Sequence, residues 1–302
     1  MFDFLLDEKN FTSLKAYMDF LNNLPATLDE IGRFSENFRR SGHELMTPPD
    51  AQALTQAAIA NENRWREILM VVPSLATMGR QLVSETATFT QEFKQVAQDT
   101  AGAAGRVPLH SIDSLRFTPI NAGSQGSNRP RDVISLMSNL CLRLEQCATV
   151  VAHFKTLIVE VSQTIHRIFV RFIDSMALRL CVCDGPFPKI EAYYSLGKIG
   201  LPNMSYAADG HYSEAQRLEK AREHLNGLGG VYVRAISAGN NLADFCHRMG
   251  YFLSCVKAEL QSNDEQRSLG RAKSSLAQIA YPLQELDAMV NALERRSLKY
   301  RR

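Results

Sequence analysis

Hydrophobic residues recur at alternating intervals of three and four along two long stretches of the chain. In the first stretch, residues 54–96, only Asn61, Gly79 and Thr86 interrupt the series. Its apolar members are Leu54, Ala58, Trp65, Ile68, Val72, Leu75, Leu82, Phe89, Phe93 and Val96. This spacing is typical of helices that pack lengthwise against other helices. At about 1.5 Å per residue, a helix of about 45 to 50 residues is about 70 to 75 Å long.

The second stretch has no interruption. Its members are Val133, Met137, Leu140, Leu144, Cys147, Val151, Phe154, Ile158, Val161, Ile165, Ile168 and Phe172. We predict one helix from Thr47 or Asp50 to about Thr100, bent at Pro73. A second helix is predicted to start with Pro130 in its first turn and to continue to about residue 180.

A shorter series predicts a helix near the N-terminus. Leu14, Met18 and Leu21 follow Asn10, which is a candidate N-cap. The series resumes over residues 28–38, and Pro25 between the two parts predicts a kink or a break.

Two further series lie in the C-terminal third of the chain. One helix is predicted to begin near Ser213, whose hydroxyl with Gln216 fits a capping box. Its apolar positions are Leu218, Ala221, Leu225, Leu228, Tyr232, Leu242, Phe245, Met249, Phe252 and Val256. The last helix is predicted to bend at Pro282, with apolar positions Leu269, Ala272, Leu276, Ile279, Leu283, Leu286, Val290 and Leu293.

These series predict an all-α fold in one domain over residues 1–302. The architecture is an elongated bundle of about five long helices, two of which form an extended antiparallel hairpin. Residues 101–128, rich in Gly, Ser, Pro and Asn, form a connector that holds a small hairpin or covers one end of the bundle. A second irregular segment, residues 184–212, joins the third and fourth helices.

Residues 184–212 are unusually apolar for a connecting segment. Such a segment either folds back on the bundle as a cap or forms a tip that contacts lipid or a partner, with tyrosines at the interface. The candidate contact residues are Phe187, Ile190, Tyr193, Tyr194, Leu196, Ile199, Leu201, Met204 and Tyr206.

Composition and charge narrow the functional classes. The formal net charge of +2 over 302 residues argues against wrapping nucleic acid. No stretch offers the run of about 18 uncharged residues that crosses a bilayer. The acidic residues of the N-terminus do not resemble a secretory signal, so we expect a protein made soluble without a signal peptide. The 6 cysteines are expected to be mostly free thiols.

No motif for catalysis, cofactor binding or metal binding emerges from the sequence. Cys181 and Cys183 are two positions apart, which on a helix points their thiols in nearly opposite directions and fits no common zinc pattern. The glycines of residues 227–230 lack the lysine and hydroxyl of a phosphate-binding loop, and a kink or a close helix crossing explains them better. We therefore predict no catalytic residue, no cofactor and no metal site.

The long apolar series, the apolar bend at 184–212 and the absence of an enzymatic motif give the chain a resemblance to the α-pore-forming toxins. Within that class it is similar to the alpha-xenorhabdolysin type of two-component cytotoxin, and most to its B component, whose tip is amphipathic. The resemblance is one of architecture over most of the chain.

The resemblance implies a second toxin component of similar helical architecture as partner, with hetero-oligomeric assembly on a target membrane. It also implies release from the cell by a non-classical route. Movement of the tip would need hinges, and the candidates are Gly227, Gly229, Gly230 and Gly239.

Two other functions stay open at this stage. The chain could be a structural or adaptor rod that binds partner helices, although its near-neutral charge argues against a membrane-curvature rod. An enzyme acting through an unrecognised cysteine or histidine is the third alternative.

Overall fold

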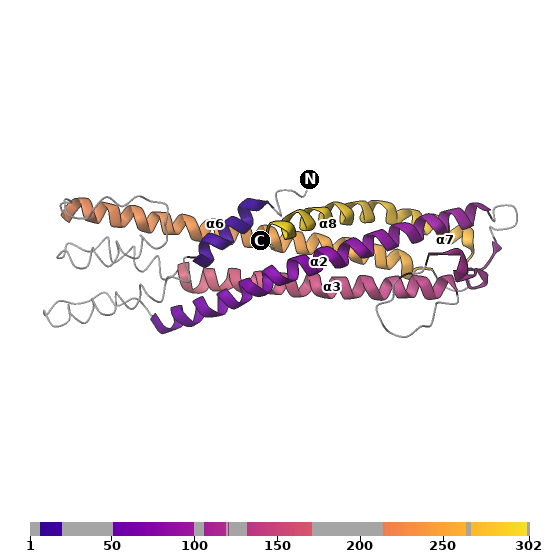
Figure 1. Ribbon diagram of the computed structural model, residues 1–302, viewed down its shortest axis with the longest axis horizontal. Helices are drawn as coiled ribbons and strands as arrows, with labels where there is room; N and C mark the ends of the chain where they lie inside the picture. The colour runs from indigo at the N-terminus through magenta and orange to yellow at the C-terminus, as the bar shows by residue number, and fades with distance from the viewer. Residues whose placement is uncertain are drawn as a thin grey trace. The chain divides into compact units, whose positions relative to one another are not determined.

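The computed structural model describes residues 7–19, 51–99, 106–118, 120, 132–170, 214–263 and 267–300. The described part is all-α, as predicted, and its only β pairing consists of two isolated bridges. The principal helices are α2 (Ala51–Asp99), α3 (Val133–Thr164), α6 (Glu214–Gln261), α7 (Leu269–Leu276) and α8 (Ala280–Tyr300), preceded by a helix over residues 8–19 (Figure 1). A π-helical turn, η4 (Ile165–Val170), follows α3 directly.

The chain divides into two compact units. Unit 1 comprises Met1–Leu6, Leu69–Thr156 and Asp244–Arg302, and unit 2 comprises Asp7–Ile68 and Leu157–Ala243. The helices α2, α3 and α6 contribute residues to both units. The single domain over residues 1–302 stays a prediction.

The apolar series predicted from the sequence form the cores of the two units. Every described member of the α2 and α3 series whose side chain is described is buried, and so are Asn61 and Thr86 at the polar interruptions. The hydroxyl of Thr86 donates to the Leu82 carbonyl one turn earlier, at 2.8 Å, which satisfies it inside the core. The prediction that these helices pack against other helices through their apolar stripes is therefore confirmed.

The stripe of α6 differs from the prediction at one position. Tyr232 is only half-buried, and the buried residues ahead of Leu242 are Val231, Ala235 and Ala238. Val231 lies eleven residues before Leu242, about three helical turns, so it shares the face of Leu242 and Tyr232 does not.

Contacts within each unit show that α3 and α6 run antiparallel. In unit 1 the ammonium group of Lys257 lies 3.4 Å from a Glu145 carboxylate oxygen, and Lys155, later in α3, lies near Cys246, earlier in α6. In unit 2, Ser162 lies against Gly239. The described parts of these two helices therefore form the predicted antiparallel hairpin.

Helix boundaries follow the predicted signals with two exceptions. α2 begins directly after Asp50, and α6 directly after Ser213. The prediction that Pro130 lies in the first turn of the third helix is wrong: α3 begins at Val133, and the Asp132 carboxylate accepts from the Ser135 N–H at 2.8 Å.

The prediction of Asn10 as an N-cap is wrong: Asn10 is buried inside the helix over residues 8–19, and its N–H donates to the Asp7 carbonyl at 2.9 Å. The Asp7 carboxylate also accepts from the Lys9 N–H at 3.4 Å, so Asp7 takes the capping position.

The two prolines act differently. α2 is continuous through Pro73, whose carbonyl accepts a hydrogen bond from the Thr77 hydroxyl at 3.0 Å. The last helix, predicted as one helix bent at Pro282, is two helices joined by the 3-10 turn η6 (Ala277–Ile279). Pro282 lies in the first turn of α8, where its missing N–H costs no intrahelical bond.

The described part of the predicted connector, residues 106–118 and 120, belongs to unit 1. It contains two 3-10 turns, η2 (Leu109–Ser111) and η3 (Ser114–Arg116). The Leu109 N–H donates to the Arg267 carbonyl at 3.1 Å, and the Leu269 N–H donates to the Val107 carbonyl at 2.8 Å. Phe117 is buried and stacks on Phe89 of α2, with ring centroids 5.5 Å apart.

Candidate functional site

The predicted contact residues of segment 184–212 lie outside the described residues, so their role stays a prediction. The four predicted hinge glycines all lie within α6, which is continuous through them. At Gly239 the structure supplies a packing reason. A Cβ built there would lie 2.2 Å from the Ser162 Oγ of α3, so any other residue forces the Ser162 side chain to shift. At Gly230 a Cβ would meet only the Arg234 guanidinium, at 3.5 Å.

A second close crossing explains an interruption of the α2 stripe. A Cβ at Gly79 would lie 2.7 Å from Cγ2 of Val290 in α8. The glycine on the apolar stripe therefore marks the point where α2 and α8 approach closely within unit 1. The sequence showed the position, but the residue opposite it is more than two hundred positions away.

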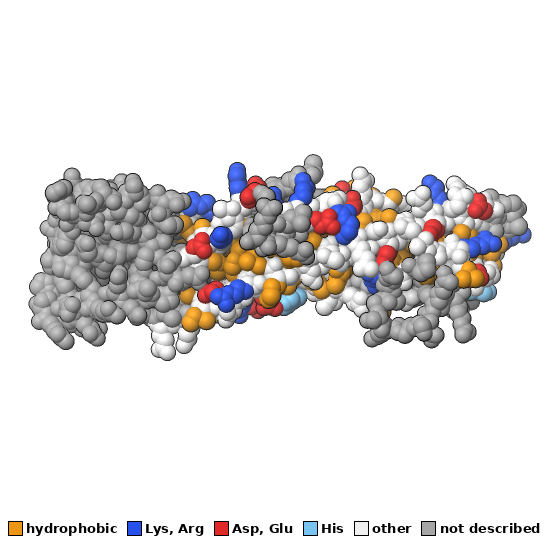
Figure 2. Space-filling view, in the orientation of Figure 1, with side chains coloured by type: hydrophobic (Ala, Val, Ile, Leu, Met, Phe, Trp, Pro, Cys, Tyr) orange, Lys and Arg blue, Asp and Glu red, His pale blue; other side chains and the backbone are white. Residues whose placement is uncertain are grey.

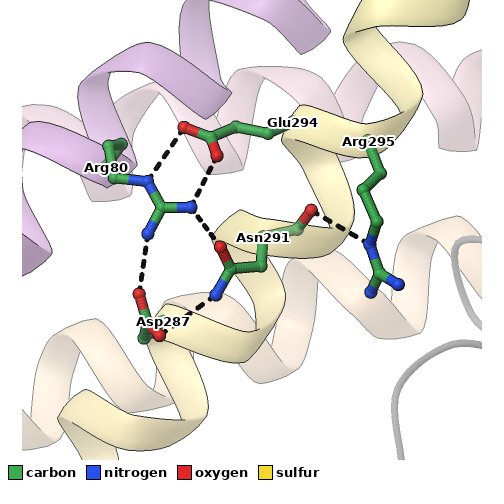
Figure 3. A network of polar contacts seen from close by, with 5 residues as sticks. All are labelled: Arg80, Asp287, Asn291, Glu294 and Arg295. Atoms are coloured by element: carbon green, nitrogen blue, oxygen red, sulfur yellow. Dashed lines mark hydrogen bonds and ion pairs between the residues drawn. The ribbon is translucent and has the colours of Figure 1, made fainter.

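Beside this crossing lies a polar cluster that we name the Arg80 cluster, made of Arg80, Asp287, Asn291 and Glu294 (Figure 3). The Arg80 Nε donates to one Glu294 carboxylate oxygen at 2.9 Å, and an Asp287 oxygen accepts from Nη1 at 2.9 Å. The Asn291 side-chain amide in turn donates to Asp287 at 3.0 Å. One guanidinium from α2 thus contacts three successive turns of α8.

The position of the Arg80 cluster determines its strength. The hydrogen bond and the charge of Arg80 lower the pKa of Glu294, against a smaller opposing effect of burial. The side chains of Arg80 and Glu294 are 37% and 38% exposed, so solvent screens the pair. The ion pair between Arg143 of α3 and Glu85 of α2 is drier, with side chains 16% and 15% exposed.

Unit 2 contains a buried polar contact between the helix over residues 8–19 and α2. The Asn61 side-chain amide donates to the Tyr17 hydroxyl at 3.1 Å, and both side chains are buried. Burial raises the pKa of Tyr17 well above its ordinary value. Among the described residues, the Asn61 amide oxygen is buried without a hydrogen-bond partner. A second polar contact joins Asn241 of α6 to the Asn10 amide oxygen at 3.2 Å.

Four cysteines lie in the described part, and all four are free. Burial raises the pKa of Cys141 and of Cys147 to about 11, and that of Cys246 to about 12. Thiolate character is therefore suppressed at these three positions, which makes them poor nucleophiles.

Hydrophobic side chains also reach the surface, where they show in orange among charged side chains on the face seen in Figure 2. Tyr251 of α6 and Tyr281 of α8, both exposed, flank Phe252, with ring centroids 5.5 and 6.1 Å from it. A groove of about 650 Å³ lies elsewhere in unit 1, between α2 and the segment formed by α7, η6 and the start of α8. Sequence reasoning missed this groove.

Among the described residues, no three His, Cys, Asp or Glu side chains converge as a metal site would require. Within the same residues, every helix is too short or too polar to cross a membrane.

Comparison with solved structures identifies the fold. The chain is similar to the crystal structure of XaxA from Xenorhabdus nematophila, with a TM-score of 0.60 and 9% sequence identity over 99% of this chain and 100% of that chain. It is likewise similar to a chain of the XaxAB pore complex from Xenorhabdus nematophila, with a TM-score of 0.58 and 9% identity over the same shares. No family model matches the chain, and no curated protein matches it.

The resemblance to the alpha-xenorhabdolysin type is thereby confirmed at the level of fold, along nearly the whole chain. The isolated component matched carries the name XaxA. The assignment to the B component stays a prediction, because the name of the XaxAB complex covers both components.

Proposed function

We propose that this protein is a component of a two-component α-pore-forming cytotoxin, which assembles with a partner subunit on target membranes. The observation that carries the proposal is the likeness in fold to XaxA and to a chain of the XaxAB pore complex over 99% of this chain. The fold match covers both units, so it is not a likeness between short helical hairpins.

The way the helices are held together supports assembly with other helical chains. Their stripes are apolar apart from Asn61, Gly79 and Thr86 of α2, and exposed ion pairs such as those of Arg80 add little to that packing. Apolar packing is nondirectional, so in the proposal a rearrangement on assembly frees parts of these buried stripes to pack against helices of a second subunit. In the proposal, the protein leaves its cell by a non-classical route and then associates with the target membrane.

Contact with the membrane or the partner is assigned to segment 184–212. No described helix has the length and apolarity of a membrane span, so the chain needs another apolar segment for lipid contact. The nine aromatic and aliphatic residues named for this segment supply one. The proposal involves no enzymatic step and no cofactor.

Dye release from liposomes tests the proposal. The protein, a candidate partner encoded beside it, and the two together are added to vesicles that contain a self-quenched dye. We expect leakage only from the mixture. Vesicles that stay intact and bind no protein under any pairing would favour the alternative, a structural or adaptor rod that binds partner helices.

A pair of double variants tests the assigned contact segment. Tyr193→Asp/Tyr194→Asp is expected to abolish leakage, because two carboxylates resist transfer into an apolar interface. The matched control is Tyr251→Asp/Tyr281→Asp, which places the same charges at tyrosines that are 61% and 64% exposed in unit 1. Circular dichroism checks that both variants keep their helicity. Equal leakage with the two variants would mean that segment 184–212 does not contact the membrane.

A further inference from the structure

The groove between α2 and the α7–η6–α8 segment of unit 1 is long enough to accept one more helix. Its α2 wall carries Ala87, Gln91, Lys94 and Gln98, which recur at intervals of four, three and four. Residues at this spacing lie on one face of a helix. The wall is therefore a straight row about 16 Å long, or about three helical turns.

The opposite wall carries two exposed alanines among larger side chains. Ala277 of η6 and Ala280 of α8 are exposed, and they lie across the groove from α2. The change from α7 to a 3-10 turn and then to α8 occurs within this wall. The alanines leave room for the side chains of a docked helix, and the floor contains the buried Phe93 and Leu276.

The charges of the groove have a single sign. Lys94 lies on the α2 wall and Lys273 on the α7 wall, and no Asp or Glu lines the groove. Neither lysine makes an ion pair with a described residue. Two ammonium groups beside an apolar floor favour a partner that combines apolar side chains with carboxylates, and such complementarity selects the partner.

We propose that this groove is the docking site for an acidic amphipathic helix of the partner subunit. The apolar face of that helix contacts Phe93 and Leu276, while its carboxylates pair with Lys94 and Lys273. The inference rests on the proposed function only in assigning the helix to the partner subunit.

Two synthetic peptides test the docking site on the full chain. Both are stapled helices of about 14 residues, because an unconstrained peptide of that length is marginally helical in water. Both peptides have the same apolar face of leucine and alanine. The positions that flank this face are glutamates in one peptide and lysines in the other. Fluorescence anisotropy measures binding, and we expect the glutamate peptide to bind at least about ten-fold more tightly.

Substitutions in the groove locate the binding. Lys94→Glu/Lys273→Glu is expected to reverse the peptide preference, while Lys9→Glu/Lys15→Glu, the same change of charge at exposed lysines of unit 2, leaves it unchanged. Ala280→Trp fills the groove and should weaken both peptides about ten-fold, whereas Ala16→Trp should not. The proposal is overturned if the two peptides bind with equal affinity, or if the groove variants leave their affinities unchanged.

Two other occupants are tested in parallel. Laurate offers one acyl chain and one carboxylate, and laurate binding lost in Lys94→Glu/Lys273→Glu without peptide binding would show a lipid site instead. Sedimentation of the chain alone tests a second copy, because a dimer that Ala280→Trp dissociates would show self-association. Either outcome overturns the partner helix.

Dye release separates this inference from the proposed function. Suppose that the peptides bind as expected, but that Lys94→Glu/Lys273→Glu with the partner releases as much dye from vesicles as the unmodified chain does. The docked helix then does not come from the partner subunit. The proposed function then stands. If the unmodified pair releases no dye, the proposed function fails, and the peptide result alone decides the groove.

Discussion

At the scale of single residues, the polar interruptions of the α2 stripe carry the most information. Asn61 meets Tyr17, Gly79 admits Val290, and Thr86 donates to the carbonyl of its own preceding turn. The sequence could show that these positions are buried, because they keep the helical spacing. It could not show their partners, since two of the three lie on other helices.

Gly239→Ala is expected to destabilise the protein by about 1 to 3 kcal/mol, because its new Cβ meets the Ser162 Oγ. Ser162→Ala removes that oxygen and leaves the Ser162 Cβ at 3.5 Å, an ordinary contact, so the double variant should recover most of the loss. Urea unfolding followed by circular dichroism measures both. Gly250→Ala is the control, since nothing lies within 4 Å of its Cβ, and it should be stabilising by up to about 1 kcal/mol. A stable Gly239→Ala protein would contradict the close crossing.

Asn61→Ala is expected to cost about 1 to 3 kcal/mol, because it removes the amide that donates to the buried Tyr17 hydroxyl. Tyr17→Phe/Asn61→Leu replaces both partners by apolar side chains of similar shape and should be close to neutral. Thermal unfolding of Tyr17→Phe, Asn61→Leu and the double variant gives the coupling energy between the two side chains. Additive losses would mean that the two side chains do not interact.

At the scale of helices, burial rather than the number of contacts decides which ion pair matters. Arg80→Met breaks more contacts than Arg143→Met, but we expect it to cost only about 1 kcal/mol because the Arg80 cluster is half-exposed and screened. Arg143→Met removes the partner of the Glu85 carboxylate, which is poorly solvated, and should lower the free energy of unfolding by about 3 kcal/mol. Urea unfolding at low and high salt measures both losses, and only that of Arg80→Met should shrink with salt.

The Arg80 cluster also predicts an acid response. Because the folded-state pKa of Glu294 is lowered, its contribution is present above the ordinary value of 4.5 and is lost as pH falls through the folded pKa. The cost of Arg80→Met should therefore shrink on acidification below about pH 4, which urea unfolding at pH 7 and pH 3 measures. A cost that stays the same at pH 3 would mean that Glu294 does not stabilise the folded state through Arg80.

Two helix starts were predictable from the sequence, since α2 begins directly after Asp50 and α6 directly after Ser213. The split of the last helix was not, because its apolar spacing continues across η6. Periodicity reports which face is buried, and a 3-10 turn of three residues hardly changes that face.

At the scale of the whole molecule, buried acidic groups in both units predict sensitivity to alkali. Tyr17 lies in unit 2, and Cys141, Cys147 and Cys246 lie in unit 1. Their folded-state pKa values are raised, so their contribution is complete below the unfolded values and is lost as pH rises through the folded ones. The melting temperature should therefore fall steadily above about pH 9, and Tyr17→Phe should soften the decline above about pH 10. A melting temperature that is flat to pH 11 would contradict the burial of these groups.

The sequence predicted the all-α class, the antiparallel hairpin and the likeness in fold to the xenorhabdolysin type, because all three depend on the length and spacing of apolar stripes. It missed the groove, because exposed alanines such as Ala87, Ala277 and Ala280 have no signature until the helices that carry them are side by side. The Arg80 cluster was missed for the same reason. The sequence does not distinguish one charged residue on a polar helix face from another. Which of them forms ion pairs depends on the helix that packs beside it.

The π-helical turn at Ile165–Val170 has a consequence for engineering this chain. Its hydrogen bonds join residues five apart instead of four, so the turn holds one residue more than a turn of ordinary α-helix does. Deleting one residue inside the turn is therefore expected to let ordinary α-helix run through with its rotational phase unchanged, whereas a deletion inside α3 itself would rotate one side of the helix by about 100° relative to the other. A single-residue deletion in this helix is best placed within Ile165–Val170 and not within α3.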